Sequence, residues 1–75
     1  MSVEEVVAKT FSLDPSEVTN HSSKDTIAEW DSMGHLSLIT GLEEEFKVSI
    51  AIVDAMAMTS VSHIKKILKD YGVAP

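Results

Sequence analysis

The stretch that decides the fold is Asp31-Ser32-Met33-Gly34-His35-Leu36-Ser37-Leu38-Ile39-Thr40-Gly41-Leu42-Glu43-Glu44-Glu45-Phe46. It predicts one amphipathic helix of about four turns. Leu38, Leu42 and Phe46 follow at spacings of four, so one side of the helix faces a core. Either Asp31 or Ser32 can cap this helix by accepting a hydrogen bond from an N–H group of the first turn. The opposite side carries Met33, Leu36, Ser37, Thr40 and Glu44.

The chain before this stretch predicts one helix and a long connection. Ser2 is a suitable N-cap for a helix over residues 2–12. A proline-led single turn is expected over residues 14–18. From residue 19 to Trp30 the chain is polar and unpatterned, with Ile27 and Trp30 as apolar anchors. Because a connection of this length is long for a small domain, we expect it to have a functional role.

The chain after this stretch predicts a short helix and a longer last one. Residues 47–53 are rich in β-branched residues and could form a strand. No second strand candidate exists to pair with them, so we expect a loop, followed by a short helix across residues 52–58. The last helix begins at Thr59 or Ser60, and Gly72 is a plausible C-cap. The fold class is therefore all-α: a small four-helix bundle, with three longer helices, a short third helix and a long loop between the first two.

Composition limits the class of protein. Seventy-five residues form a single domain, residues 1–75, and a chain this short buries only about 60% of its unfolded surface. No apolar run approaches the roughly 20 residues that cross a bilayer, and no basic segment followed by an apolar one opens the chain. Cysteine is absent, which excludes disulfides and thiolate chemistry. We expect a monomer in the cytoplasm, without membrane insertion.

Negative charge is concentrated around the central helix. The chain has twelve acidic residues against six lysines, and six of those acids lie between residues 25 and 46, where no Lys or Arg occurs. Such a surface is repelled by nucleic acid and attracts partners with basic patches. The simpler interpretation is an acidic helix face that is only solvated. No nucleic-acid partner is expected.

Three parts of the chain together resemble the acyl carrier protein family. They are Asp25-Thr26-Ile27, Trp30-Asp31-Ser32-Met33-Gly34-His35-Leu36 and Leu42-Glu43-Glu44-Glu45-Phe46. The family hallmark is an Asp-Ser-Leu or Asp-Ser-Met tripeptide that opens the second helix, and that helix ends in a Leu-Glu-Glu-Glu-Phe type sequence. The resemblance covers nearly the whole chain and includes the step into the last helix, Thr59-Ser60-Val61.

The resemblance implies a function. Ser32 matches the serine to which a phosphopantetheinyl transferase attaches 4′-phosphopantetheine from coenzyme A. The chain would hold acyl groups as thioesters on the thiol of that arm and would not itself be an enzyme. Asp31 matches the family aspartate that helps to position the transferase and its magnesium. Partner enzymes that load or transfer acyl groups would place their own basic patches against five residues of this chain: Met33, Leu36, Thr40, Glu43 and Glu44.

Physical chemistry supports this arrangement independently of the family resemblance. The N-terminus of a helix carries unpaired N–H groups and partial positive charge, which favour a phosphodiester attached there. A flexible arm delivers its cargo at high effective concentration, so weak and short-lived partner contacts suffice. An acidic surface speeds encounter with basic partners and adds little lasting affinity.

Other interpretations of the same residues are open. Ser32 could be only a helix cap. His35 could contact the phosphate of the arm, or could form a nucleophilic pair with Ser32 in a small hydrolase, although no third orienting group and no Gly-x-Ser-x-Gly motif accompany it. His21 and His63 are too scattered for a metal site, and no metal ligand is predicted. Met56 and Met58 are expected in the core. An acyl chain could lie between helices in a pocket lined by Val7, Leu38, Leu42, Ile50 and Ile64.

The sequence differs from the typical family pattern in the second helix, and this difference bears on which pathway the chain serves. Carriers of primary fatty-acid synthesis usually have more acids along the second helix, where this chain has Gly34, His35, Ser37 and Thr40. We therefore expect a stand-alone carrier of a specialised pathway that makes a polysaccharide, a lipid or a secondary metabolite. A housekeeping fatty-acid carrier, an aminoacyl carrier and a non-carrier acidic helical adaptor are the alternatives.

Overall fold

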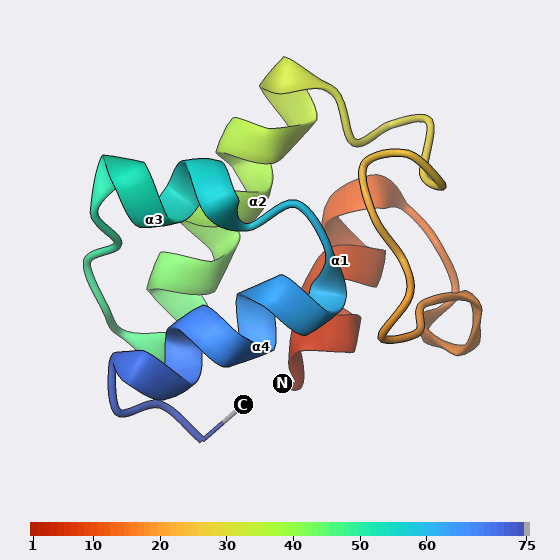
Figure 1. Ribbon diagram of the computed structural model, residues 1–75. Helices are drawn as coiled ribbons and strands as arrows, with labels where there is room; N and C mark the ends of the chain where they lie inside the picture. The colour runs from red at the N-terminus through yellow and green to blue at the C-terminus, as the bar shows by residue number, and fades with distance from the viewer. Residues whose placement is uncertain (75) are drawn as a thin grey trace.

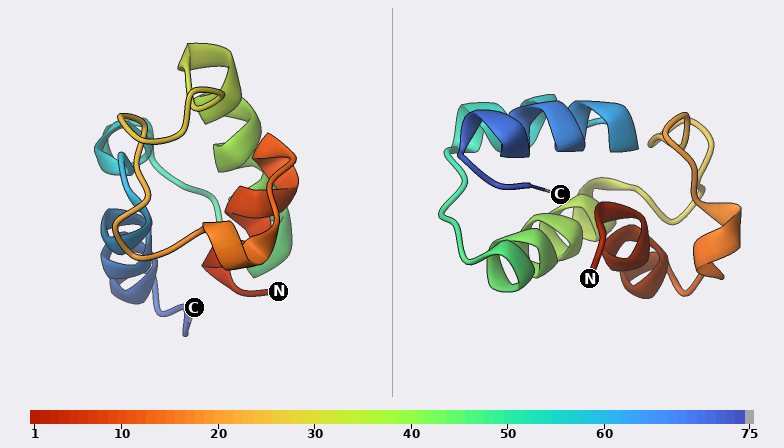
Figure 2. Two further views of the ribbon diagram at one scale, coloured as in Figure 1. Left: turned by 90° about the vertical axis from the view of Figure 1, so that its right-hand side faces the viewer. Right: turned by 90° about the horizontal axis from the view of Figure 1, so that it is seen from below.

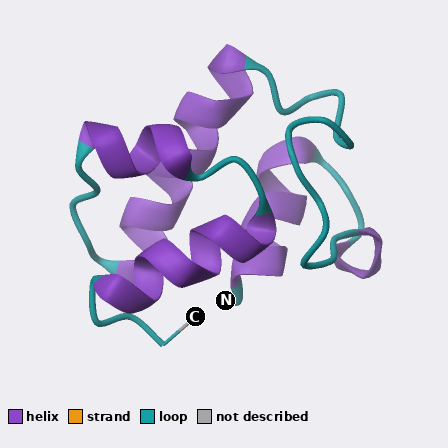
Figure 3. Cartoon of the chain, in the orientation of Figure 1, coloured by secondary structure: helices purple, strands orange, loops and turns teal. Residues whose placement is uncertain are grey.

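The computed structural model describes residues 1–74 and shows a small helical bundle (Figure 1). The elements are α1 (Val3–Phe11), the single-turn 3-10 helix η1 (Pro15–Glu17), α2 (Ser32–Phe46), α3 (Ile52–Ala57) and α4 (Val61–Asp70). Figure 3 shows only helices and loops in the described part of the chain. The predicted all-α bundle, with three longer helices and a short third one, is confirmed.

Helix α1 is defined by reciprocal hydrogen bonds at its start. The Ser2 hydroxyl accepts from the Glu5 N–H at 3.2 Å, and the Glu5 carboxylate accepts from the Ser2 N–H at 2.9 Å. This capping box satisfies donors that the first turn leaves unpaired. The helix ends at Phe11, and its C-cap Ser12 has a left-handed φ of 57°. Ser2 as the N-cap is confirmed, and the helix is shorter by one residue at each end than the predicted range.

The core lies where α1 packs against both α2 and α4. Figure 2 shows these helices from two further directions. Leu38 and Leu42 of α2 are fully buried, and Phe46 is half-buried at the end of the same stripe. The predicted core side of α2 is therefore confirmed. The other fully buried large side chains are Met58, Ile64, Leu68, Val3, Val7 and Val61.

The long connection between η1 and α2 is ordered by small polar residues. Turns form where side chains accept from nearby backbone groups, as when the Thr26 hydroxyl accepts from the Ser23 N–H at 2.9 Å. The connection is also bonded to the start of α4: the Lys24 N–H donates to the Thr59 carbonyl at 3.1 Å, and the Ser22 carbonyl accepts from the Val61 N–H at 2.9 Å. The sequence showed no pattern here because these bonds use single residues rather than a periodic stripe.

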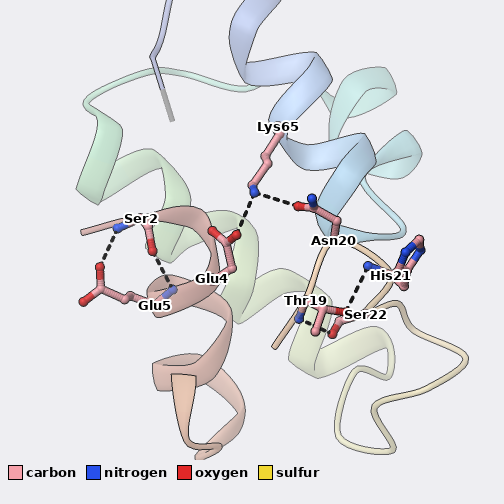
Figure 4. Close-up of polar contacts among 8 residues, drawn as sticks. All are labelled: Ser2, Glu4, Glu5, Thr19, Asn20, His21, Ser22 and Lys65. Carbon is pink, nitrogen blue, oxygen red and sulfur yellow. Dashed lines mark hydrogen bonds and ion pairs between the residues drawn. The ribbon is translucent and has the colours of Figure 1, made fainter. Parts of the chain in front are cut away.

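A lysine joins this connection to two helices (Figure 4). The Lys65 ammonium on α4 donates to the Glu4 carboxylate of α1 at 2.6 Å and to the Asn20 side-chain oxygen at 2.7 Å. Figure 4 also shows the Thr19 N–H donating to the Ser22 hydroxyl, at 2.9 Å, next to this contact. The cation therefore connects three segments that are distant in sequence.

Residues 47–53 do not form a strand. Helix α2 ends at Phe46, and its C-cap Lys47 has a left-handed φ of 55°. The chain continues as a loop in which Val48 and Ile50 are half-buried. The predicted loop is confirmed. The prediction that both methionines of the next segment lie in the core is right for Met58 and wrong for Met56. Met58 is fully buried, whereas Met56 is 71% exposed on a helix that buries none of its residues.

Candidate attachment site at the start of α2

The start of α2 gives separate roles to the two residues that could cap it. Asp31 is the N-cap, and its carboxylate accepts from the Gly34 N–H at 2.8 Å. Ser32 is the first residue of the helix and is exposed. Because Asp31 satisfies the donor, the capping role does not account for Ser32. The hydroxyl lies at the positive end of the helix dipole, where attached negative charge is stabilised.

A shallow groove runs beside Ser32. It has a volume of about 520 Å³ and is lined by Lys24, Trp30, Asp31, Ser32, His35, Leu36, Met56 and Thr59. One wall comes from α2 and the connection that precedes it, and the other comes from α3 and the residues that follow it. The groove is open to solvent, so a group attached at Ser32 can reach it.

Gly34 allows the start of α2 to approach the preceding chain closely. A Cβ atom at this position would lie 2.3 Å from the Glu29 carbonyl oxygen and 2.8 Å from a ring carbon of Phe11. The first of these neighbours is backbone and cannot rotate away. The absence of a side chain therefore sets how deeply the attachment end of α2 packs onto α1 and the connection.

His35 is engaged by protein groups on both sides of its ring. Its Nδ1 atom accepts from the Trp30 indole N–H at 3.0 Å, and its Nε2 atom bonds to the Ala55 carbonyl at 2.7 Å. In this arrangement neither ring nitrogen is left for Ser32 or for the phosphate of an arm. The structure thus gives no geometric support to the nucleophilic Ser32–His35 pair, and it places His35 between helices instead of on the open surface.

The residues predicted to dock partners divide into two groups. Met33 and Leu36 are 76% and 66% exposed, and Thr40 and Glu44 are also exposed on the same helix. Glu43 differs, because it is half-buried and its carboxylate accepts from the Ile50 N–H at 2.9 Å. This contact holds the loop after α2, so Glu43 has a structural role that sequence reasoning did not detect.

The exposed apolar surface extends beyond α2 onto α3. Ile52 and Val53 are 80% and 75% exposed, and Met56 is similarly exposed. Sequence reasoning missed this part of the surface. The available signal was the length of α3, because a helix of six residues presents little area to a core and leaves large side chains outside.

A serine–histidine contact occurs at the start of α4, away from Ser32. The Ser60 hydroxyl lies 2.6 Å from Nδ1 of His63 and accepts from the His63 backbone N–H at 3.2 Å. Ser60 is the N-cap of α4, so capping explains the bond from the His63 backbone N–H. Among residues 1–74, no group of three or more His, Asp or Glu side chains is arranged to hold a metal ion.

Comparison with models of known protein families gives no match for the chain. The resemblance carried by residues 25–46 therefore remains a prediction from the sequence. Within the described residues, no helix has the length and apolar character required to cross a membrane.

Proposed function

We propose that the chain is a carrier protein that holds acyl groups as thioesters on a 4′-phosphopantetheine arm attached to Ser32. A phosphopantetheinyl transferase supplies the arm from coenzyme A, and other enzymes load and remove the cargo. The carrier contributes the attachment point and a recognisable surface, and the chemistry belongs to its partners. The phosphodiester forms between the Ser32 oxygen and the phosphate of the arm, with adenosine 3′,5′-bisphosphate as the leaving group.

The observation that carries this proposal is the position of Ser32. Its hydroxyl is exposed on the first residue of α2, and the capping role that would otherwise account for it belongs to Asp31. The start of this helix favours the negative charge of a phosphodiester. The neighbouring groove offers a place for the distal part of the arm.

The surface around Ser32 supports the same function. Met33, Leu36, Thr40 and Glu44 are exposed on α2, and no Lys or Arg lies between residues 25 and 46 of the sequence. A partner with a basic and partly apolar patch fits such a surface, and the association is fast and salt-sensitive. Weak docking suffices because the arm keeps the cargo near the partner.

The pathway that the carrier serves is inferred from the composition of α2. The polar first half of α2, with Gly34, His35 and Ser37, favours a carrier of a specialised polysaccharide, lipid or secondary-metabolite pathway. A housekeeping fatty-acid carrier or an aminoacyl carrier would use the same attachment chemistry with other partners. Mass spectrometry of the species bound to the arm, isolated from the source organism, distinguishes these cargoes.

Intact-mass spectrometry tests the attachment directly. The purified chain is incubated with coenzyme A, Mg²⁺ and a promiscuous phosphopantetheinyl transferase. We expect the mass of one arm to be added to the wild type and to Ser37→Ala, a control that removes another exposed serine of the same helix. Ser32→Ala is expected to gain nothing. Uptake of the arm by Ser32→Ala would overturn Ser32 as the attachment point. No uptake by the wild type would overturn the carrier function and favour the acidic adaptor.

Asp31→Asn separates capping from recognition of the transferase. Asparagine is as good an N-cap as aspartate, so thermal stability should change little. The variant removes the negative charge beside Ser32, and we expect slower attachment of the arm with an unchanged melting temperature. Attachment at the wild-type rate would show that the charge of Asp31 has no part in recognition.

A further inference from the structure

Helix α3 is held in place with little apolar burial. None of its six residues is buried, and its N-terminal neighbour Ala51 provides no side-chain cap. Ile52, Val53 and Met56 project mainly into solvent. A helix this short is not stable by itself in water. The position of α3 therefore depends on specific contacts with the rest of the bundle.

Side chains from α2 and from the end of α4 provide such contacts. Tyr71 donates to the Asp54 carboxylate at 2.6 Å and accepts from the Ala51 N–H at 2.9 Å, which holds the start of α3. His35 bonds to the Ala55 carbonyl at 2.7 Å, which holds its second half. The hydrogen bond to Asp54 raises the pKa of Tyr71, as expected for a phenol that donates to a carboxylate.

The partners of His35 determine which nitrogen carries its proton. An indole N–H can only donate, so Nδ1 of His35 must be the acceptor of the bond from Trp30. In the neutral ring the proton is then on Nε2, which donates to the Ala55 carbonyl. Trp30 also stacks on Phe11, with ring centroids 5.5 Å apart. A continuous chain of contacts therefore runs from Phe11 on α1 through Trp30 and His35 to α3.

This chain of contacts lies along the groove beside Ser32. Trp30, His35 and Leu36 line it from the side of α2, and Met56, the residue after Ala55, lines it from α3. A shift of α3 away from His35 would move Met56 and change the width of the groove. Polar residues contribute to its lining, but most of the lining surface is apolar and suits a hydrocarbon segment more than a charged one.

We propose that His35 is a positioning residue: it fixes α3 relative to the attachment end of α2 and so sets the groove that receives the acyl chain of the cargo. The role in receiving cargo rests on the carrier function proposed above, whereas the coupling of His35 to α3 does not. The indole of Trp30 holds the imidazole in the tautomer that can donate to Ala55. The groove then has a defined shape before cargo arrives.

The coupling is tested on the unmodified full-length chain by amide hydrogen exchange. His35→Phe keeps a flat ring and removes both hydrogen bonds, whereas His35→Gln keeps one acceptor and one donor. In His35→Phe we expect exchange of the α3 amides to be about fivefold faster, with α1 and α4 unchanged, and the indole signal of the single tryptophan to lose its hydrogen-bonded shift. In His35→Gln, both the exchange of the α3 amides and the indole signal should stay close to those of the wild type.

Tyr71→Phe is the matched control, because it removes the contact at the other end of α3. We expect it to speed exchange at Ala51 and to leave the Trp30 indole signal in place. Uniform acceleration across all helices in His35→Phe would indicate only a general loss of stability and would overturn the proposal. Unchanged α3 exchange in His35→Phe would also overturn it.

The role in receiving cargo is tested with arms of two lengths. The transferase attaches butyryl- or octanoyl-phosphopantetheine from the corresponding acyl-coenzyme A. We expect the octanoyl form to shift the methyl signals of Leu36 and Met56 more than the butyryl form does, and His35→Phe to abolish this difference while its Ser32 is fully modified. Equal shifts in wild type and variant would overturn the inference and leave the carrier function intact. Failure to attach any arm would overturn the carrier function and the cargo role together, and the exchange data would still decide the coupling.

Discussion

Replacing Gly34 by alanine tests how the attachment end of α2 is packed. An added Cβ would meet the Glu29 carbonyl oxygen at 2.3 Å, the Phe11 ring at 2.8 Å and an Asp31 carboxylate oxygen at 3.3 Å. The closest of these is backbone, so the start of the helix must move outward. Such a movement weakens the contacts of Trp30, which stacks on Phe11 and follows Glu29 directly.

The expected change in the unfolding free energy of Gly34→Ala is the sum of opposing contributions. Alanine is a better helix former than glycine by at most about 1 kcal/mol. Overpacking at a rigid neighbour costs about 1–3 kcal/mol, and disturbing the aromatic stacking and the indole hydrogen bond adds about 1–2 kcal/mol more. We therefore expect Gly34→Ala to lose about 2 kcal/mol of unfolding free energy, which for a domain of this size lowers the melting temperature by about 8–16 °C.

Gly41→Ala is the matched control in the same helix. A Cβ there would lie 3.5 Å from a Val6 methyl carbon and 3.7 Å from the Thr10 hydroxyl, which are ordinary contact distances. The variant should gain up to about 1 kcal/mol from helix propensity. Urea unfolding followed by far-UV circular dichroism and by fluorescence of Trp30 measures both variants. The reasoning would be refuted if Gly34→Ala were as stable as Gly41→Ala.

Three further predictions concern other parts of the bundle. Met58→Ala should lower the unfolding free energy by about 2–4 kcal/mol, whereas Met56→Ala should change it by less than about 0.5 kcal/mol, because only Met58 is buried; thermal unfolding compares the two. The hydrogen bond from Lys65 lowers the pKa of Glu4 in the folded state. The contact therefore stabilises the fold above the unfolded pKa of Glu4, and this stabilisation is lost as pH falls through the folded pKa of Glu4. Lys65→Met should therefore lose less stability than the wild type when urea unfolding is repeated between pH 7 and about pH 3. Lys47→Gly should raise the unfolding free energy by about 0.5–1 kcal/mol in the same assay, because glycine adopts the left-handed conformation at this helix end without strain.

Much of the fold was predictable because it depends on local pattern. Leu38 and Leu42 recur at helical spacing, and both are fully buried. Ser2 and Glu5 stand three residues apart, as a capping box requires, and they form one. The position of Ser32 at the start of a helix was also predictable, since a capping residue precedes it and an apolar stripe follows.

The contacts that shape the candidate site were less predictable. His35 and Ala55 are twenty residues apart, and nothing in the local sequence of either one indicates that they are bonded. The family resemblance placed Glu43 on the docking surface, but its carboxylate accepts from the Ile50 N–H of the following loop. In both cases the partner is a backbone group, and every residue in the chain offers one.

The amino-acid sequence alone determined the helices, the core side of α2 and the exposed serine at its start, because periodicity and capping act within a few residues along the chain. The tertiary structure alone decided which of Met56 and Met58 is buried and what His35 contacts. Helix α3 is too short to carry its own apolar stripe, so its orientation comes from contacts with α2 and the end of α4. Those contacts join residues that are distant in sequence, and they exist only once the helices have packed together.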